Sequence, residues 1–313
     1  ALGTSGITAL NTAQIQALDT TDVTNLSSAQ VGALSSSQIA ALTSSQIIGL
    51  ETADMGALSS AQVKVLSAST IGQLSSTQIK TLTSTQLQVL TSTQIQALGT
   101  SGVNQLTTAQ ISTLSSSNIA SLSSSQIINL DATLFNKLTS AQIGSISTVA
   151  LSSLSSDQLQ AFGTTGSSAL SASQISALGS SGITKLSITQ LGTLSTSAVN
   201  TLSSAQITAL GTANINNLSS TQLRALPSAA INTLSSAQVA QLDTKIATLT
   251  SNQISAIATS VIKELSSTQI QALGTSGITA LNTAQIQALD TTDVTNLTSA
   301  QVGALSSSQI AAL

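Results

Sequence analysis

The sequence predicts an all-α solenoid, a rod-like stack of very short helices, and three observations lead to this prediction. An apolar residue recurs at every eighth position through most of the 313-residue chain. The residue that follows it is nearly always of a type that caps helix N-termini. The few charged residues are distributed within each eight-residue unit as a helix dipole favours. A short, fixed period of this kind is typical of repeat architectures.

The apolar lattice defines the eight-residue unit, which we call an octad. It begins at Leu2 and runs to Leu242, where one seven-residue spacing shifts it to Leu249 and on to Leu313. Five residues after each lattice position stands a second apolar residue, with Ser167 as the plain exception. A straight amphipathic helix cannot keep a period of eight, because two turns take about 7.2 residues and the apolar stripe would wind around the axis. Each octad must therefore contain a bend.

Each octad also contains the signals of a helix start. The residue after the lattice position is Ser, Thr, Asp, Asn or Gly, except at Glu51, Pro227 and Ala258. Where Gln stands three residues further on, as in Ser27 with Gln30, the pair matches the capping box S/T-x-x-E/Q. The two apolar positions then correspond to the two halves of a hydrophobic staple. We therefore predict that each octad forms one short helix.

The charged residues support this interpretation independently. Nine of the ten acidic residues fall at the cap or in the first turn of an octad, and Glu264 is the exception. Six of the seven basic residues fall six or seven positions after the lattice residue. Helix dipoles favour this distribution by a few tenths of a kcal/mol per charge, whereas a β-solenoid has no axial dipole.

A second periodicity, of sixteen residues, lies on the first. When the octad at Leu2 is counted as even, every odd octad has Gln at the box position, whereas the even octads vary there. We therefore predict that two octads form one sixteen-residue coil and that the glutamines stack as a ladder along one side. The ladder consists of Gln14, Gln30, Gln46, Gln62, Gln78, Gln94, Gln110, Gln126, Gln142, Gln158, Gln174, Gln190, Gln206, Gln222, Gln238, Gln253, Gln269, Gln285 and Gln301.

The expected role of the ladder is structural, because each Gln can close its own capping box or hydrogen-bond to the coil above. Amide side chains carry both donors and acceptors. A polar strip that binds a ligand or a neighbouring fibre is therefore the alternative interpretation.

Two other folds remain open at this point. Helices of about six residues do not persist alone, so their stability has to come from stacking against neighbours. Even octads such as GTSGITAL are rich in Gly and β-branched residues. Their side of the coil could be extended, which would give a mixed helix–strand solenoid resembling a very short leucine-rich repeat, and an all-β solenoid is the third possibility. Both kinds of octad share the same apolar spacing, which favours the helical conformation for both.

The chain also contains a long duplication. Residues 272–313 copy residues 1–42 with a single difference, in which Thr298 replaces Ser27. The sequence thus predicts one solenoid module of tandem octads over residues 1–271 and the start of a second, continuous module over residues 272–313. We expect the natural polypeptide to be longer than this chain.

Several kinds of chemistry are not expected from this composition. Without His or Cys, the chain cannot supply an acid–base His, a thiolate, a usual zinc site or a Ser-His-Asp triad. We therefore expect no enzyme, no cofactor and no metal site. The i, i+3 carboxylate pairs, which could hold Ca²⁺ weakly but are also explained as helix caps, are Asp19 with Asp22, Glu51 with Asp54, and Asp290 with Asp293. The GTSG segments at Gly3, Gly99 and Gly274 lack the Lys of a phosphate-binding loop and are interpreted as caps.

Charge and hydropathy limit the possible partners. Seven basic and ten acidic residues give a net charge of −3, which offers no electrostatic footprint for nucleic acid or anionic lipid. Mean hydropathy is positive at +0.37, yet hydroxyl residues interrupt every apolar run well before the roughly 18 residues that a membrane span requires. We expect neither nucleic-acid binding nor a membrane span.

The low charge, the absence of Cys, the bias toward Ser, Thr, Gln, Ala and Leu, and the near-identical tandem modules resemble the repeat regions of large bacterial surface and fibre-forming proteins. This resemblance implies a structural element at the cell surface or outside the cell, such as a rod, filament, sheath or adhesin stalk. Its partners would be further modules of the same chain or lateral copies. The alternative is a binding module that holds a polysaccharide or another surface through the Gln ladder or the Ser/Thr faces.

Overall fold

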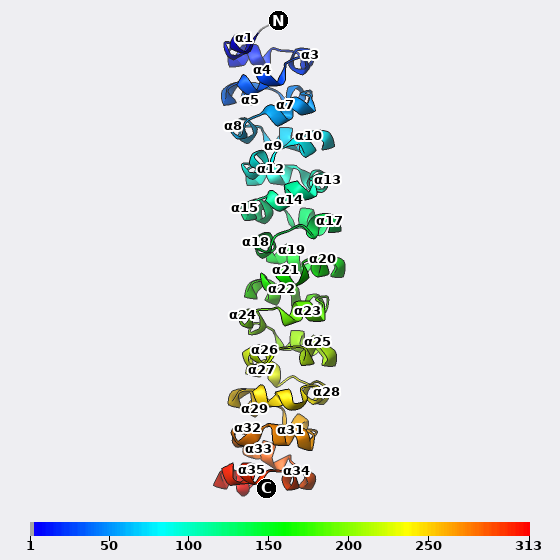
Figure 1. Ribbon diagram of the computed structural model, residues 1–313, viewed down its shortest axis with the longest axis vertical. Coiled ribbons are helices and arrows are strands. Elements are labelled where there is room, and N and C mark those ends of the chain that lie inside the picture. The colour runs from blue at the N-terminus through cyan, green and yellow to red at the C-terminus, as the bar shows by residue number, and fades with distance from the viewer. Residues whose placement is uncertain (1–2) are drawn as a thin grey trace. The chain divides into compact units, whose positions relative to one another are not determined.

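The computed structural model describes residues 3–313, so the predicted lattice position at Leu2 lies outside the described residues. Between residues 3 and 313 the chain forms short helices and no strand (Figure 1). The prediction of an all-α solenoid built from very short helices is therefore confirmed. The mixed helix–strand and all-β alternatives do not apply to these residues.

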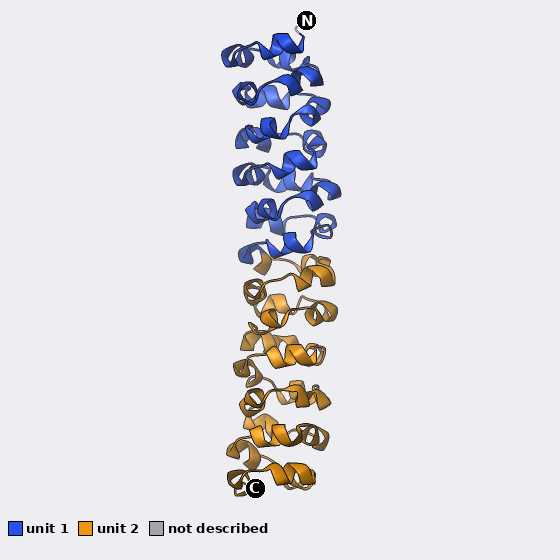
Figure 2. Ribbon diagram, turned by 60° about the vertical axis from the view of Figure 1, so that its left-hand side comes forward, with its two compact units in different colours: residues 1–150 blue, residues 151–313 orange. Residues whose placement is uncertain are grey.

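The chain divides into two compact units, residues 1–150 and 151–313 (Figure 2). The helices of unit 1 are α1 (Thr4–Thr8), α2 (Thr12–Gln16), α3 (Thr20–Thr24), α4 (Ser28–Ala33), α5 (Ser36–Ala41), α6 (Ser44–Ile48), α7 (Thr52–Ala57), α8 (Ser60–Lys64), α9 (Ala68–Gly72), α10 (Ser76–Thr81), α11 (Ser84–Gln88), α12 (Ser92–Ala97), α13 (Gly99–Asn104), α14 (Thr108–Thr113), α15 (Ser116–Ser121), α16 (Ser124–Ile128), α17 (Ala132–Phe135) and α18 (Ser140–Gly144). Helix α19 (Thr148–Ser152) includes residues of both units.

The helices of unit 2 are α20 (Ser156–Ala161), α21 (Gly163–Ser168), α22 (Ala172–Ile183), α23 (Ile188–Gly192), α24 (Thr196–Val199), α25 (Ser204–Asn216), α26 (Ser220–Ala225), α27 (Ser228–Ile231), α28 (Ser236–Ala240), the 3-10 helix η1 (Asp243–Thr248), α29 (Ser251–Ala256), α30 (Thr259–Ile262), α31 (Ser267–Ala272), α32 (Gly274–Ala280), α33 (Thr283–Gln287), α34 (Thr291–Thr295), α35 (Ser299–Ala304) and α36 (Ser307–Ile310). The predicted module boundary between residues 271 and 272 follows the sequence duplication alone and stays a prediction.

The bend that a period of eight requires lies at the lattice residue and the cap. Leu42 has an extended backbone (φ −64°, ψ 137°), and so has the next residue, Thr43 (φ −71°, ψ 160°). Two extended residues stop one helix and redirect the chain before the next begins. The hydroxyl of Thr43 then accepts the backbone N–H of Gln46 and caps the new helix.

Helices three apart in sequence pack on one another, so the turn of the solenoid is larger than predicted. In unit 1, α1 packs on α4, α2 on α5 and α3 on α6, and α5, α8, α15 and α18 follow one another along one side in Figure 1. The predicted sixteen-residue coil is therefore wrong, since equivalent residues of successive helices in contact, such as Thr4 and Ser28, are 24 positions apart. Pairs of octads alternate for another reason, which the side-chain hydrogen bonds of the ladder show below.

Both apolar positions of the octad form the core of each unit. The second apolar residues, such as Ile15, Val63 and Ile207, are 0 % exposed. The lattice residues, such as Leu58 and Leu226, are also buried. Burying one such side chain stabilises the fold by about 1.5–3 kcal/mol. Because helices this short do not persist alone, this core provides most of their stability.

Ser167, the exception in the apolar pattern, is buried without leaving its hydroxyl unpaired. Its exposed fraction is 0 %. The hydroxyl donates to the Gly163 carbonyl at 2.8 Å and accepts from Gln190 Nε2 at 2.8 Å. A polar residue is tolerated in the core here because both of its hydrogen-bonding capacities are used.

A second type of junction uses glycine in place of the extended lattice residue. Leu178 stays buried inside α22 while Gly179 takes φ +61°, a left-handed conformation that favours glycine. The side chain of Leu178 then covers Gly182, where an added Cβ would lie 2.8 Å from the Leu178 Cβ. The same left-handed backbone occurs at Gly99, Gly163, Gly211 and Gly274. Gly3, by contrast, is an ordinary N-cap with φ −74°.

The seven-residue spacing between Leu242 and Leu249 is a 3-10 helix, η1. A 3-10 helix rises about 2.0 Å per residue against 1.5 Å in an α-helix, so it covers the length of an octad with one residue fewer. Asp243 starts it with φ 45°, the one positive φ at a non-glycine residue in the described chain.

No helix between residues 3 and 313 is both long and apolar enough to cross a membrane. The longest, α22 and α25, have 12 and 13 residues and are each interrupted by a left-handed glycine.

The glycine junction predicts an order of effects for three alanine substitutions in unit 2. Gly179→Ala should lower the free energy of unfolding by about 1–2 kcal/mol, because alanine is strained at positive φ. Gly182→Ala should lower it as well, because its Cβ meets the Leu178 side chain. Gly192→Ala, where an added Cβ meets no atom within 4 Å, serves as the control and should not lower it. Urea unfolding followed by circular dichroism measures all three, and equal effects would contradict the assigned junction geometry.

Candidate functional site

The ladder glutamines occupy the third position of their helices, where each closes a capping box. The backbone N–H of Ser219 donates to Gln222 Oε1 at 2.9 Å, and the Gln222 N–H donates to Ser219 Oγ at 3.2 Å. All nineteen ladder residues close this pair of hydrogen bonds with their own cap. Two N–H groups at each helix start are thereby satisfied, which would otherwise lack a partner within the helix.

The amide nitrogen of the same side chain binds the preceding turn of the solenoid. Gln222 Nε2 donates to the carbonyl oxygens of Leu191 at 3.0 Å and Leu194 at 2.9 Å. These carbonyls lie at the C-terminal end of α23 and at the following lattice residue, 31 and 28 positions before the glutamine. Gln62 makes the equivalent bonds in unit 1, to Val31 at 3.1 Å and Leu34 at 2.7 Å. One side chain thus joins the start of one helix to the end of another.

These hydrogen bonds explain the alternation of octads without a sixteen-residue coil. Ladder glutamines within each unit reach the end of the octad four before their own, as Gln46 reaches Ile15 and Leu18. An odd octad is therefore hydrogen-bonded to another odd octad, although a full turn of the solenoid contains between three and four octads of both kinds. The alternation of Gln reflects which octads are hydrogen-bonded to each other. It does not give the number of helices in a turn.

The ladder lies inside the wall of the solenoid. Sixteen of the nineteen glutamines are only 1–5 % exposed. Gln14 is exposed, and Gln30 and Gln158 are half-buried. The sixteen buried amides are out of reach of a ligand in solution.

The double role of the side chain explains why the box residue is Gln and never Glu in the odd octads. A capping box accepts either residue, because only a side-chain oxygen is needed to accept the N–H of the cap. The carbonyls of the preceding turn need a donor, and a carboxylate has none. An ionised Glu would also lose hydration in a buried position. The contact between turns therefore selects the amide.

Some even octads use the same arrangement. Gln38 and Gln86 donate to Leu10 at 2.7 Å and Leu58 at 2.6 Å. Asn118, with a shorter side chain, reaches the Leu90 carbonyl at 3.2 Å.

Asp54 occupies the box position of an even octad, where its carboxylate cannot donate to a carbonyl of the preceding turn. Its Oδ1 accepts the Ser28 hydroxyl at 2.7 Å. Its Oδ2 is buried with no hydrogen-bond partner among the described residues. The Glu51 side chain does not cap the helix that carries Asp54.

Two lysines supply a donor at even octads whose box position carries no amide, and the sequence pattern did not predict these contacts. Gly182 occupies the box position of an even octad and has no side chain, and Lys185 Nζ donates at 2.7 Å to the Leu154 carbonyl, 28 positions before Gly182. In the seven-residue repeat that begins at Leu242, Lys245 Nζ donates to the carbonyl oxygens of Asn216 and Leu218. The sequence feature that could have indicated these contacts is a lysine close to a box position that lacks Gln.

A second set of contacts between turns runs along the outside and was also missed. Polar residues six positions after the lattice residue, most of them exposed, donate to the carbonyl 25 positions later. The contacts are Thr24 to Gly49, Gln88 to Thr113, Gln96 to Ser121, Asn104 to Asn129, Gln160 to Lys185 and Gln271 to Asn296. Arg224 makes the same kind of contact with the Thr248 carbonyl at 3.0 Å. From the sequence, the helix dipole predicts only that basic residues are favoured near this position, although side-chain donors in general recur there.

Two of the three carboxylate pairs serve as capping boxes. Asp19 Oδ1 accepts the Asp22 N–H at 2.6 Å, and Asp290 Oδ1 accepts the Asp293 N–H at 2.8 Å. Burial raises the pKa of Asp293, the hydrogen bond from the Asp290 backbone lowers it, and the Asp290 charge raises it. Residues 3–313 contain no group of three or more His, Cys, Asp or Glu side chains placed to hold a metal ion.

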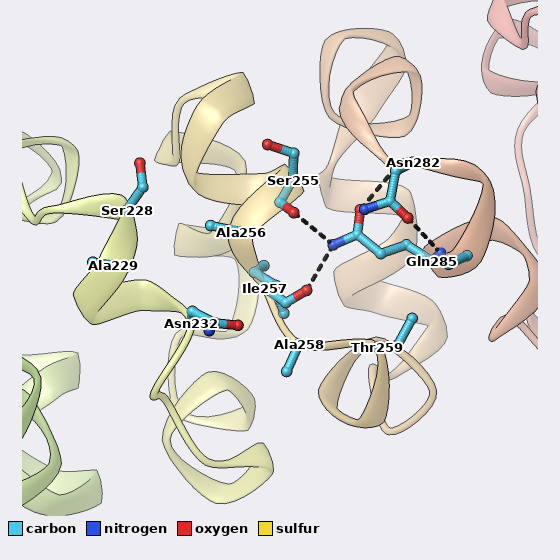
Figure 3. A pocket seen from close by; sticks show the side chains of 11 residues that line it. Ser228, Ala229, Asn232, Ser255, Ala256, Ile257, Ala258, Thr259, Asn282 and Gln285 are labelled. Atoms are coloured by element: carbon cyan, nitrogen blue, oxygen red, sulfur yellow. Dashed lines mark hydrogen bonds between the residues drawn. The ribbon is translucent and has the colours of Figure 1, made fainter.

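The surface of unit 2 has a groove of about 460 Å³ across three successive turns (Figure 3). It is lined by Ser228 of α27 and its C-cap Asn232, by Thr259 of α30 and by Asn282, the N-cap of α33, and none of the lining residues is charged. Figure 3 shows that Gln285, whose amide binds the carbonyl of Ile257 at 2.7 Å, lies beside this groove. Ser228, Asn232 and Thr259 form no side-chain hydrogen bond within the described residues and are free to bind a ligand.

Comparison with known proteins shows a repeat protein. Four segments, residues 15–50, 47–84, 183–220 and 278–313, match the ALTTAQ repeat family, and together they cover less than half of the chain. No curated protein matches the sequence.

Substitutions at one buried and one exposed ladder glutamine separate the two roles of the side chain, which are closing the capping box and binding the preceding turn. Gln78→Glu retains the box acceptor but loses the donor to the carbonyls of Ile48 and Leu50, so we expect it to cost about 1–3 kcal/mol of unfolding free energy. Gln14→Glu, at an exposed ladder glutamine, should change the free energy of unfolding by no more than about 0.5 kcal/mol. Denaturant unfolding of the full chain measures both variants. If the two cost the same, the contact between turns does not select the amide.

Proposed function

We propose that this protein is a structural, non-catalytic repeat protein that forms an extended rod, filament, sheath or adhesin stalk at the cell surface or outside the cell. The observation that carries the proposal is the bonding of turn to turn by the buried glutamines. Each turn repeats the same amide contacts and the same pair of apolar residues, so every added repeat extends the stack by the same interactions. A stack of this kind gains stabilising contacts with every turn that is added along its axis.

The surface composition supports a structural role over a catalytic one. The chain has no His and no Cys, and its most regular polar side chains are buried. With 5 % charged residues and a net charge of −3, neutral hydroxyl-rich faces would repel one another little. Lateral packing of copies and further modules of the same chain are therefore the proposed partners, and nucleic acid is not among them.

The location outside the cell rests on resemblance. The absence of Cys and the Ser, Thr, Gln, Ala and Leu bias are shared with the repeat regions of large bacterial surface and fibre-forming proteins. Matches to one repeat family at four places support the coarser statement, that the chain is a tandem-repeat protein.

Small-angle scattering of the full chain tests the extended shape. A compact globule of this length would have a radius of gyration of about 20 Å. We expect a clearly larger value and a scattering profile typical of a rod, with imaging showing elongated particles. A compact particle near the globular value would contradict the proposal.

A polysaccharide-binding module is the second candidate, and the groove in Figure 3 is the observation that favours it. Neutral hydroxyl and amide groups match the hydrogen-bonding groups of an uncharged sugar chain. The predicted use of the Gln ladder for this purpose is disfavoured, because most of its amides are buried. Binding would use the exposed Ser, Thr and Asn side chains instead.

A pair of matched variants tests this second candidate. Ala229 lines the groove at the second position of α27, and Ala205 stands exposed at the second position of α25 outside it. Binding of a neutral soluble glucan, measured by affinity electrophoresis, should be reduced at least tenfold by Ala229→Leu and unchanged by Ala205→Leu. Absence of binding by the unmodified chain, or equal loss in both variants, would exclude the groove as the site for this glucan.

A further inference from the structure

A carboxyl group occupies a buried box position of an even octad in unit 2, a position at which Gln309 and the odd octads have an amide. Asp293 is the third residue of α34 and is only 5 % exposed. Its Oδ2 accepts the backbone N–H of Asp290 at 3.2 Å, as the Oε1 of a ladder glutamine does. The box is complete, and the second carboxyl oxygen, Oδ1, accepts no hydrogen bond within the described residues.

We propose that Asp293 is a proton-dependent contact between turns, which binds the preceding turn when its carboxyl group is protonated and releases it when the group is ionised. The carbonyl 28 positions earlier belongs to Leu265, the lattice residue that a ladder amide would contact here. No side chain in the described residues donates to it. A protonated carboxyl supplies the O–H donor that this position lacks, and a carboxylate does not.

Asn118 shows that a side chain of this length can make the contact. Asn and Asp have the same shape, and both stand at the third helical position behind a capping residue. Asn118 Oδ1 accepts the Ser115 N–H at 3.1 Å, while its Nδ2 donates to the Leu90 carbonyl, 28 positions earlier, at 3.2 Å. A protonated Asp293 has the same acceptor and donor in the same places.

The charges around Asp293 favour the protonated form. Asp290, on the same helix, adds a second negative charge. Helix α31, which packs against α34, carries no titratable side chain. Lys263 and Glu264, which precede α31, pair with each other at 3.7 Å in solvent. No cation on the packed element therefore stabilises the buried carboxylate.

The direction of the pH effect follows from these surroundings. Burial raises the pKa of Asp293 in the folded chain above its unfolded value. The stabilisation is therefore fully present below the unfolded pKa and is lost as the pH rises through the folded pKa. Unit 2 should hold this turn more tightly in acid than at neutral pH, a regulatory property beyond the structural role proposed above.

The duplicated sequence provides an internal control. Asp22 has the same neighbours in sequence, TTDVT, and the same capping partner, Asp19, but it is exposed. The same substitution at both sites therefore compares one segment in a buried and an exposed environment.

The test is thermal unfolding of the full chain between about pH 4 and pH 8, a range that spans the titration of a raised Asp. Asp293→Asn provides a permanent donor, so we expect its melting temperature to exceed that of the unmodified chain at neutral pH by a few degrees. The gain should disappear as the pH falls. Asp22→Asn should follow the unmodified chain at every pH. A gain that does not depend on pH, or equal behaviour of the two variants, would overturn the proposal.

A second measurement does not depend on the stability of a variant. Carboxyl ¹³C shifts of the unmodified chain should show Asp293 titrating above the ordinary Asp range of about 4. Asp290→Asn, which keeps a side-chain oxygen for the cap but removes the charge, should lower that midpoint. A midpoint for Asp293 at or below the ordinary value would also overturn the proposal.

Discussion

The structure depends on one side-chain amide that acts in two directions. Its oxygen accepts the N–H of its own helix cap, and its nitrogen donates to carbonyls about 28 residues earlier. Helices of four to six residues cannot hold themselves together, so both their ends need partners from outside the helix. A buried Gln satisfies an N-terminus and a C-terminus at once. The apolar core provides the attraction between turns, while the amide sets which octad lies over which.

Some even octads without an amide at the box position meet this requirement with another side chain. At Gly182 the side chain of Leu178 fills the vacant space, and Lys185 reaches the carbonyl that an amide would bind. In the seven-residue repeat that begins at Leu242, Lys245 reaches the Leu218 carbonyl in the same way. Asp54 and Asp293 stand apart, because a carboxylate closes the box or accepts a hydroxyl but cannot donate to the preceding turn. At these two buried box positions a carboxyl group stands where an amide would bind the preceding turn.

Local features of the octad were predictable because their signals lie within eight residues. The caps, the boxes and the burial of both apolar positions follow from spacing and residue type, as at Ser219 and Gln222. The number of octads in a turn was predicted wrongly, because an alternation of two in sequence was equated with two helices per coil. The outer contacts, such as Gln88 to Thr113, and the replacement of Gln by Lys185 join residues 25 or more apart. No local pattern reveals which residues such a distance brings together.

By itself, the sequence determined that the chain is an all-helical repeat protein, because helix starts and an apolar face are encoded in every octad. Tertiary structure alone decided what identical segments do in different places. In the segment LGTSG, Gly3 is extended at φ −74° whereas Gly274 is left-handed at φ +63°. In the segment TTDVT, Asp22 is exposed and Asp293 is buried. The physical reason is that backbone conformation and burial at these positions depend on the turn packed against them, and the residues of that turn lie outside the repeated segment.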